Sequence, residues 1–181
     1  FMQTAHNCKN NGAVNLLCCL KNFMLYALRN EWIEKNPFQH YKMKPEHNKD
    51  KDHLTKAELE TLINKPMPNE RLGRIRDVFT FCCLTGLAFT DADHLRPEHI
   101  GADANGTLWI HKPREKTAIM SRIPLLPYTI ELLRKYESDK TCRERGRMLP
   151  IPSNNKMNAY LKEIAAICNI DKTLTTHVAR H

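Results

Sequence analysis

A histidine and an arginine lie three residues apart near the end of the sequence, where the segment TLTTHVARH contains His177 and Arg180. If this segment is helical, the two side chains share one face, because residues i and i+3 are neighbours on a helix. The arginine can then bind a phosphate through two parallel hydrogen bonds, and the histidine can exchange a proton near neutral pH. The pair indicates a phosphate site, and a solvated terminal turn is the open alternative.

A second group of cations lies in the segment TLWIHKPREKTAIMSRIPLL, residues 107–126. Its alternating aliphatic residues predict two strands joined near residues 113–116. Arg114 and Lys116 are two residues apart, so on a strand both side chains would point to the same face. Both cations could then approach one phosphate. The open alternative is a solvated loop tip that only attracts phosphate groups in general.

Length and charge limit the class of protein. The chain has 181 residues, enough for one domain or one domain and part of another. A net charge of +8 favours a polyanionic partner, with nucleic acid ahead of a membrane surface. No apolar run reaches the roughly 18 residues of a membrane span, and no secretory signal pattern opens the chain. We therefore expect a cytoplasmic, nucleoid-associated protein without a membrane partner.

The seven cysteines are odd in number and contain no C-x-x-C pair, so we expect no metal site. The adjacent pairs Cys18–Cys19 and Cys82–Cys83 lie inside apolar stretches. Their surroundings predict small core residues in a reducing compartment.

The elements that must position these cations are mostly helical. Periodic apolar residues predict one long helix over 11–32, ended by the segment around Pro37, and then a polar linker over 39–53. Further helices are expected over 54–63, with a capping box, 69–87, 127–137 and 153–170. A short helix near 90–96 would be capped by Thr90 or Asp91, and 139–148 would form a basic loop. The fold class is therefore mainly α with one small antiparallel sheet.

This order of elements, with the motifs TGLAFTDADHL, IPLLP and THVARH, resembles the tyrosine recombinase (phage integrase) family. It is most similar to the branch common in Bacteroides-type bacteria and their mobile elements. The resemblance implies that residues 1–38 are the C-terminal part of a helical core-binding domain and that 39–53 are a linker. Residues 54–181 would be a catalytic domain, truncated before its nucleophile.

The resemblance also implies a reaction. In this family a tyrosine hydroxyl attacks a DNA phosphate, forms a 3′-phosphotyrosyl link and releases a 5′-hydroxyl, which allows DNA integration or excision. The link conserves the phosphodiester energy, so no metal, ATP or other cofactor is implied. The implied partners are double-stranded DNA, further copies of the full-length protein in a homotetramer on paired sites, and an accessory DNA-bending protein.

The motifs assign roles to residues of this chain. Arg180 and His177 match the family's phosphate-binding His-x-x-Arg pair. Lys116 lies where the catalytic lysine is expected, with Lys112 as its rival. Supporting roles fall to Asp91 and His181, although His181 could equally be a helix-surface residue. The residues expected to contact DNA are Lys21, Lys112 and Arg122.

Two departures from the family pattern matter. Residue 88 is Ala88 where most relatives carry a phosphate-binding arginine, so Arg114 is our candidate replacement. All five tyrosines precede His177, so none occupies the nucleophile's place. We therefore expect an inactive fragment of a site-specific DNA recombinase. The alternative is a DNA-binding protein that kept the fold and lost the chemistry.

Overall fold

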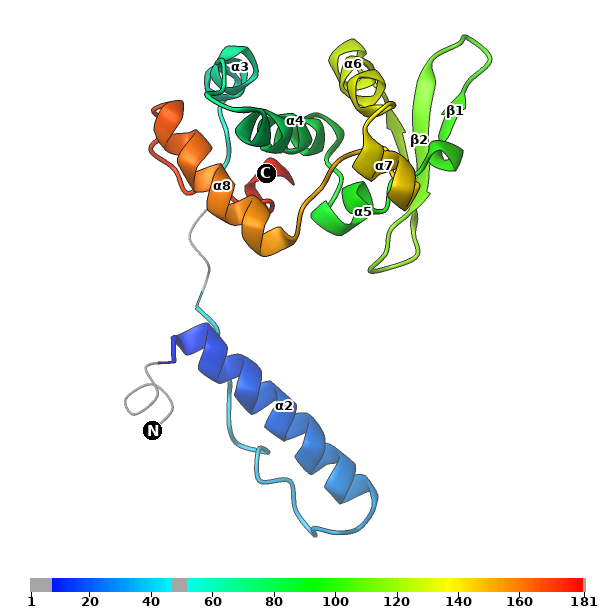
Figure 1. Ribbon diagram of the computed structural model, residues 1–181. Helices are drawn as coiled ribbons and strands as arrows, with labels where there is room; N and C mark the ends of the chain where they lie inside the picture. Colours follow the sequence, from blue (N-terminus) through cyan, green and yellow to red (C-terminus); the bar gives the residue numbers. More distant parts are fainter. Residues whose placement is uncertain (1–7, 47–51, 181) are drawn as a thin grey trace. The chain divides into compact units, whose positions relative to one another are not determined.

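A computed structural model describes residues 8–46 and 52–180 of the chain. The chain divides into two compact units, Phe1–Asp50 and Lys51–His181. Figure 1 shows a single long helix in the first unit and all remaining helices and strands in the second.

The helix of the first unit, α2, spans Asn10–Arg29 and is shorter than the sequence predicts. Asn30 caps its end, and the backbone and side-chain nitrogens of Asn30 both donate to Tyr26 O, at 3.1 and 2.9 Å. Glu31 follows with a left-handed φ of 59°. Trp32 therefore lies outside the helix, where its ring packs edge-on against Tyr26.

The segment expected to be a linker, 39–53, is in part attached to α2. The Asn11 side chain donates to Glu46 O at 3.0 Å and accepts from Glu46 N at 2.8 Å. This reciprocal pair copies the hydrogen bonding of a short strand ladder. Residues 39–46 therefore return along the helix, and residues 47–51 lie outside the described part of the chain.

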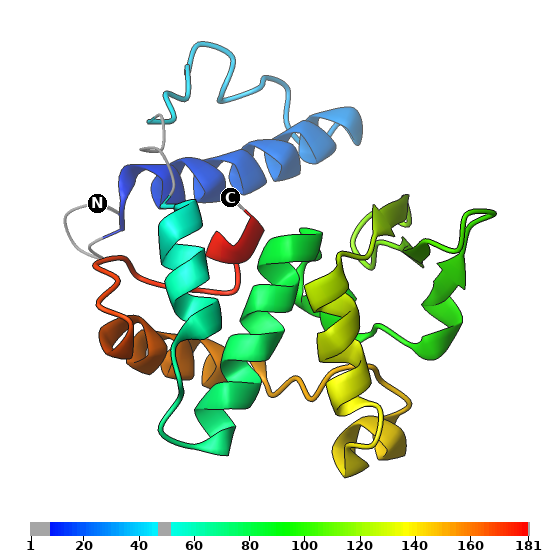
Figure 2. The ribbon, with the colours of Figure 1, turned by 90° about the horizontal axis from the view of Figure 1, so that it is seen from above.

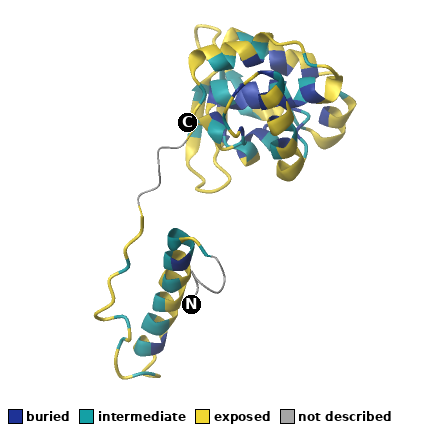
Figure 3. Ribbon diagram, turned by 90° about the vertical axis from the view of Figure 1, so that its left-hand side faces the viewer, coloured by how far each residue is buried: buried dark blue, intermediate teal, exposed yellow. Residues whose placement is uncertain are grey.

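Exposure differs between the units. Figure 3 shows α2 mostly half-buried or exposed, whereas buried residues gather in the second unit. Cys18 and Cys19 are exposed, so the prediction that they are core residues was wrong. Cys82 is buried, as predicted, and so are Cys142 and Cys168.

The second unit contains six α-helices among its described residues. They are α3 (Lys56–Asn64), α4 (Glu70–Thr85), α5 (Phe89–Asp93), α6 (Pro127–Tyr136), α7 (Lys140–Arg145) and α8 (Asn154–Ile167). Two short 3₁₀ helices, η1 (Pro97–His99) and η2 (Val178–Arg180), complete the helical elements. The predicted basic loop is helical as α7 because Asp139 caps it, its side chain accepting from Cys142 N at 3.1 Å.

One antiparallel sheet lies at the edge of this unit, in the order β1 (Ile100–Ala102), β2 (Leu108–Pro113) and β3 (Met120–Pro124). The hairpin of β2 and β3 was predicted, whereas β1 was not. Ile110 faces Ile100 on β1 and Ile123 on β3 and is fully buried. The face of the sheet that carries Ile110 is therefore the one that packs on the core.

Helix α4 is the centre of the second unit. Figure 2 shows it between α3 and α6, and it also packs against α8 and η2. The apolar residues along one face of this helix are all buried: Leu72, Ile75, Val78, Phe79 and Cys82. Burial of this stripe, at roughly 1.5–3 kcal/mol per large side chain, fixes α4 against its neighbours.

The predicted capping box at the start of α3 is present. Thr55 N donates to Glu58 Oε2 at 2.7 Å, and Glu58 N donates to Thr55 Oγ1 at 3.2 Å. Lys172, from the loop after α8, also donates to Glu58 Oε2 at 2.7 Å. The Lys172 hydrogen bond, followed by the bond from Thr55 N, lowers the pKa of Glu58 from 4.5 to about 2.

This shift predicts a pH dependence of stability. A carboxylate with a lowered folded-state pKa stabilises the fold above pH 4.5, and its contribution disappears as the pH falls towards 2. Glu58→Gln should lower the free energy of unfolding by about 1 kcal/mol at pH 7 and by much less near pH 2. Denaturant titrations at both pH values measure this. Glu60→Gln, on the same helix but fully outside the capping box, should cost less than about 0.5 kcal/mol at either pH. Equal stability of Glu58→Gln and the unmodified chain at pH 7 would contradict the prediction.

Candidate active site

Three segments distant in sequence meet at the C-terminal end of α4. Gly86 caps this helix with a left-handed φ of 66°. Its carbonyl oxygen accepts a hydrogen bond from Arg180 Nε at 3.0 Å. Figure 2 shows η2, in red, beside this end of α4. The structure therefore brings the C-terminal arginine to the TGL motif.

The segment with His177 and Arg180 is a short 3₁₀ turn rather than the expected start of an α-helix. Arg180 N donates to His177 O at 3.2 Å, which is the i to i+3 bond of a 3₁₀ helix. The two residues are therefore one turn apart, and both are exposed. His181 lies outside the described residues.

The left-handed conformation of Gly86 gives a test of this corner. A Cβ added at Gly86 would meet no atom within 4 Å, so the cost of Gly86→Ala comes from the backbone alone. We expect a loss of about 1 kcal/mol in the free energy of unfolding. Gly73→Ala, in the open interior of α4, is the matched control and should stabilise the protein by about 0.5–1 kcal/mol. Unfolding curves that show the same sign for both variants would contradict this account.

Asp91 connects α5 to the hairpin. The N-cap of α5 is Ala88, so the prediction of Thr90 or Asp91 as the cap was wrong. Asp91 instead lies inside the helix, is 4% exposed, and accepts a hydrogen bond from Glu115 N at 2.9 Å. Its buried carboxylate therefore helps to fix the turn between β2 and β3, and its supporting role in catalysis stays a prediction.

Arg114 and Lys116 lie in the turn of the hairpin and not on a strand. Strand β2 ends at Pro113, so the expectation that strand alternation aligns the two side chains was wrong. The turn closes through Arg114 N, which donates to Ile119 O at 2.9 Å, and Arg114 O, which accepts from Ala118 N at 2.8 Å. Within the described chain, the side chains of Arg114 and Lys116 have no hydrogen-bond or ion-pair partner, and both are exposed.

A pocket of about 450 Å³ separates the end of α4 from the hairpin. It is lined by Arg114 and Arg122 on one side and by Gly86 and Asp91 on the other. Arg114 thus borders the residue whose carbonyl holds Arg180. Of the four expected catalytic residues only Arg114 lines the pocket, and Arg180 is connected to it through the Gly86 carbonyl. Lys116 lies in the exposed turn and His177 one turn before Arg180, and neither of them lines the pocket.

The residues expected to contact DNA have different environments. Arg122 is exposed on β3, and Lys21 is half-buried on α2 in the first unit. Lys112 is only 3% exposed and donates to Glu115 Oε1 at 2.8 Å. This burial argues against a direct DNA contact by Lys112 in the described conformation.

None of the five tyrosines lines the pocket. Tyr136 is buried and donates to Asp77 Oδ2 at 2.8 Å; burial first, and Asp77 second, raise the pKa of its hydroxyl. Tyr160 lies beneath the Arg71 guanidinium. These contacts indicate structural roles for Tyr136 and Tyr160.

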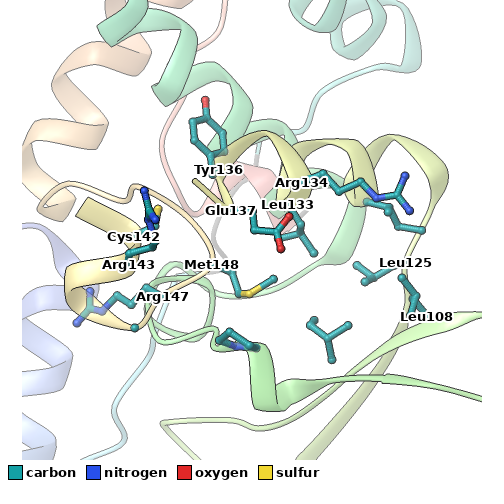
Figure 4. Close-up of a pocket in the computed structure, with 14 residues that line it drawn as sticks. Leu108, Leu125, Leu133, Arg134, Tyr136, Glu137, Cys142, Arg143, Arg147 and Met148 are labelled. Carbon is teal, nitrogen blue, oxygen red and sulfur yellow. The ribbon is translucent and has the colours of Figure 1, made fainter. Parts of the chain in front are cut away.

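A larger apolar pocket of about 660 Å³ lies elsewhere, between the sheet, α6 and α7 (Figure 4). Leu108, Leu125, Leu133 and Met148 contribute to its walls. None of the expected catalytic residues lines it. In the described parts of the chain, no group of three or more His, Cys, Asp or Glu residues could hold a metal ion, and no helix combines the length and apolarity needed to span a bilayer.

Sequence reasoning missed Glu115, which lies between the two expected catalytic cations. It is bonded through its backbone to Asp91 and through its side chain to Lys112. Strand alternation from the buried Ile110 places Lys112 on the same, core-facing side, and this signal could have predicted a paired, buried lysine.

Solved structures of site-specific recombinases and integrases have a similar fold. A lambda integrase dimer bound to a COC′ core site matches 95% of the chain at a TM-score of 0.68 and 14% identity. The XerH site-specific recombinase in a post-cleavage complex with a palindromic difH substrate matches 82% of the chain, at a TM-score of 0.58 and 19% identity. An integrase from mycobacterium phage Brujita matches 90% of the chain, at a TM-score of 0.51 and 15% identity.

The chain spans 62%, 45% and 53% of these three structures, respectively. No protein-family model and no curated protein matches the sequence. The mainly α architecture with one small antiparallel sheet confirms the predicted fold class. The chain has the tyrosine recombinase fold.

Proposed function

We propose that this chain is the phosphate-binding part of a site-specific DNA recombinase of the Bacteroides-type branch. The observation that carries the proposal is the hydrogen bond from Arg180 to Gly86 O, beside a pocket that Arg114 lines. Gly86 is the link between the two residues: it accepts a hydrogen bond from Arg180 and lines the same pocket as Arg114. The planar donor sets of the two arginines suit phosphate oxygens.

The proposed chemistry assigns each cation a task. Arg114 and Arg180 stabilise the extra negative charge that the non-bridging oxygens carry in the pentavalent transition state. Lys116 protonates the leaving 5′-oxygen, and His177 donates a hydrogen bond to the phosphate and helps to move the proton. The tyrosine that forms the 3′-phosphotyrosyl link is supplied from outside these 181 residues, because no tyrosine here lines the pocket.

The wider setting is also part of the proposal. The reaction would take place on double-stranded DNA in the cytoplasm, with full-length copies assembled as a tetramer and with an accessory protein that bends the DNA. Neighbours with this fold include XerH bound to its difH substrate and lambda integrase bound to a core site. The net charge of +8 suits the same polyanionic partner.

Duplex binding tests the first half of the proposal. Each phosphate that a cation neutralises contributes a slope of about −0.9 in log K against log salt. We expect the chain to bind a duplex of about 30 base pairs with a slope of about −3 or steeper, as measured by fluorescence anisotropy between about 50 and 200 mM salt. Absence of binding at low salt, or binding independent of salt, would contradict it.

A DNA-binding protein without chemistry is the second candidate, and Ala88 is the observation that favours it, because alanine cannot bind phosphate. The full-length protein distinguishes the two. A covalent protein–DNA adduct on a nicked suicide substrate supports the recombinase. Tight binding without an adduct supports the non-catalytic protein.

A further inference from the structure

A lysine on the core-facing side of the sheet needs an explanation. Lys112 follows Ile110 by two residues on β2 and lies opposite Ser121 on β3, and it is 3% exposed. A buried ammonium without a partner is strongly destabilising. Its Nζ is therefore significant: it donates to Glu115 Oε1 at 2.8 Å, three residues further along the chain.

Glu115 forms hydrogen bonds through both its backbone and its side chain. Its backbone N donates to the buried Asp91 Oδ1 at 2.9 Å, and its carboxylate accepts from Lys112. His94 Nδ1 lies 3.8 Å from the same carboxylate oxygen. The Lys112 hydrogen bond holds the pKa of Glu115 below its usual range, so the carboxylate stays ionised. Helix α5, strand β2 and the turn therefore share one set of contacts.

We infer that Asp91, Lys112 and Glu115 form a hairpin latch that positions the turn for phosphate binding. The inference rests on the proposed function. Arg114 and Lys116 are the immediate neighbours of Glu115, so the two contacts that fix Glu115 also fix the direction in which both cations leave the backbone. Lys112 and Glu115 are thus positioning residues, and neither touches the phosphate.

The latch predicts a change in DNA affinity opposite to the change that charge alone would cause. Glu115 is an acidic residue between two cations that face DNA, so removing its charge should tighten binding if it acts only as a charge. If it holds the turn, Glu115→Gln should weaken binding, because Arg114 and Lys116 lose their fixed geometry. The side chain of Glu115 is 45% exposed, so the variant is expected to fold.

The experiment compares the duplex affinity of five variants at one salt concentration. Glu115→Gln and Lys112→Met should each weaken binding about 5- to 20-fold, and the double variant should be no weaker than either, because all three break one contact. Glu144→Gln, an exposed acid paired with Lys140 on α7, is the matched control and should bind equally or slightly more tightly. Lys140→Met removes the same charge as Lys112→Met, and it should weaken binding less than about threefold.

Hydrogen exchange supplies a readout that does not depend on DNA. In Glu115→Gln the amides of residues 114–118 should exchange at least about tenfold faster, while amides in α4 and α8 keep their rates. Unchanged exchange in the turn, or tighter DNA binding by Glu115→Gln, would overturn the latch. Failure of the unmodified chain to bind DNA would instead overturn the proposed function, and the exchange rates would still decide whether the turn is held by these contacts.

Discussion

Replacing Arg180 by alanine is expected to slow formation of the covalent adduct by the full-length protein about 10²- to 10³-fold. The physical reason is loss of a fixed donor aimed at the charge that develops on the phosphate. Arg180 Nε already donates to Gly86 O at 3.0 Å, so the guanidinium group loses less conformational freedom when it binds a phosphate. Single-turnover adduct formation on a suicide substrate measures the effect.

Two controls separate this role from net charge. Arg145→Ala removes an equal charge from an exposed position at the end of α7 and should change the rate less than about threefold. Arg180→Lys keeps the charge but lacks the planar donor set, so it should remain well below the unmodified enzyme. Similar rates for Arg180→Ala and Arg145→Ala would show that position 180 has no special role.

Replacing Arg114 by alanine is expected to weaken duplex binding about 10-fold or more, in line with the 1.5–3 kcal/mol of a charge-assisted hydrogen bond. Arg114 lines the pocket beside Gly86 and Leu87, which immediately precede Ala88. The side chain of an arginine at position 88 would therefore begin next to the pocket that Arg114 lines. If Arg114 has taken over the role of the missing arginine, Ala88→Arg should restore much of the affinity that Arg114→Ala loses.

The rescue is measured as a double-mutant cycle in anisotropy titrations. Ala88→Arg alone should change duplex affinity little, because Arg114 already binds the phosphate that an arginine at position 88 would reach. The matched control combines Arg145→Ala with Ala88→Arg, where the two changes should simply add. If the double variant Arg114→Ala with Ala88→Arg binds the duplex as weakly as Arg114→Ala alone, Arg114 does not replace the missing arginine.

Much of the fold could be predicted because its signals are local. The apolar spacing of α4, the capping box of α3 and the alternation of β2 and β3 all appear in the sequence as they do in space. Strand β1 has three residues and no alternation long enough to detect, so only its pairing with β2 reveals it. The end of α2 depends on the hydrogen bonds of Asn30, which apolar periodicity does not report.

The site was less predictable because its contacts join distant segments. The motifs identified Arg180 and Asp91, but only the fold shows that Arg180 bonds to Gly86 O and that Asp91 holds the turn. The arrangement of Arg114 and Lys116 was predicted from strand geometry, and the structure places both in a turn. Spacing alone could not indicate that their position depends on Glu115.

The central claim is that Arg114 and Arg180 approach one phosphate at the end of α4. A crystal structure of the chain with bound tungstate, located by the anomalous scattering of tungsten, tests it most directly. The account predicts an ion within hydrogen-bonding distance of both guanidinium groups, beside Gly86. Tungstate bound only at other basic surfaces, with this pocket empty, would contradict it.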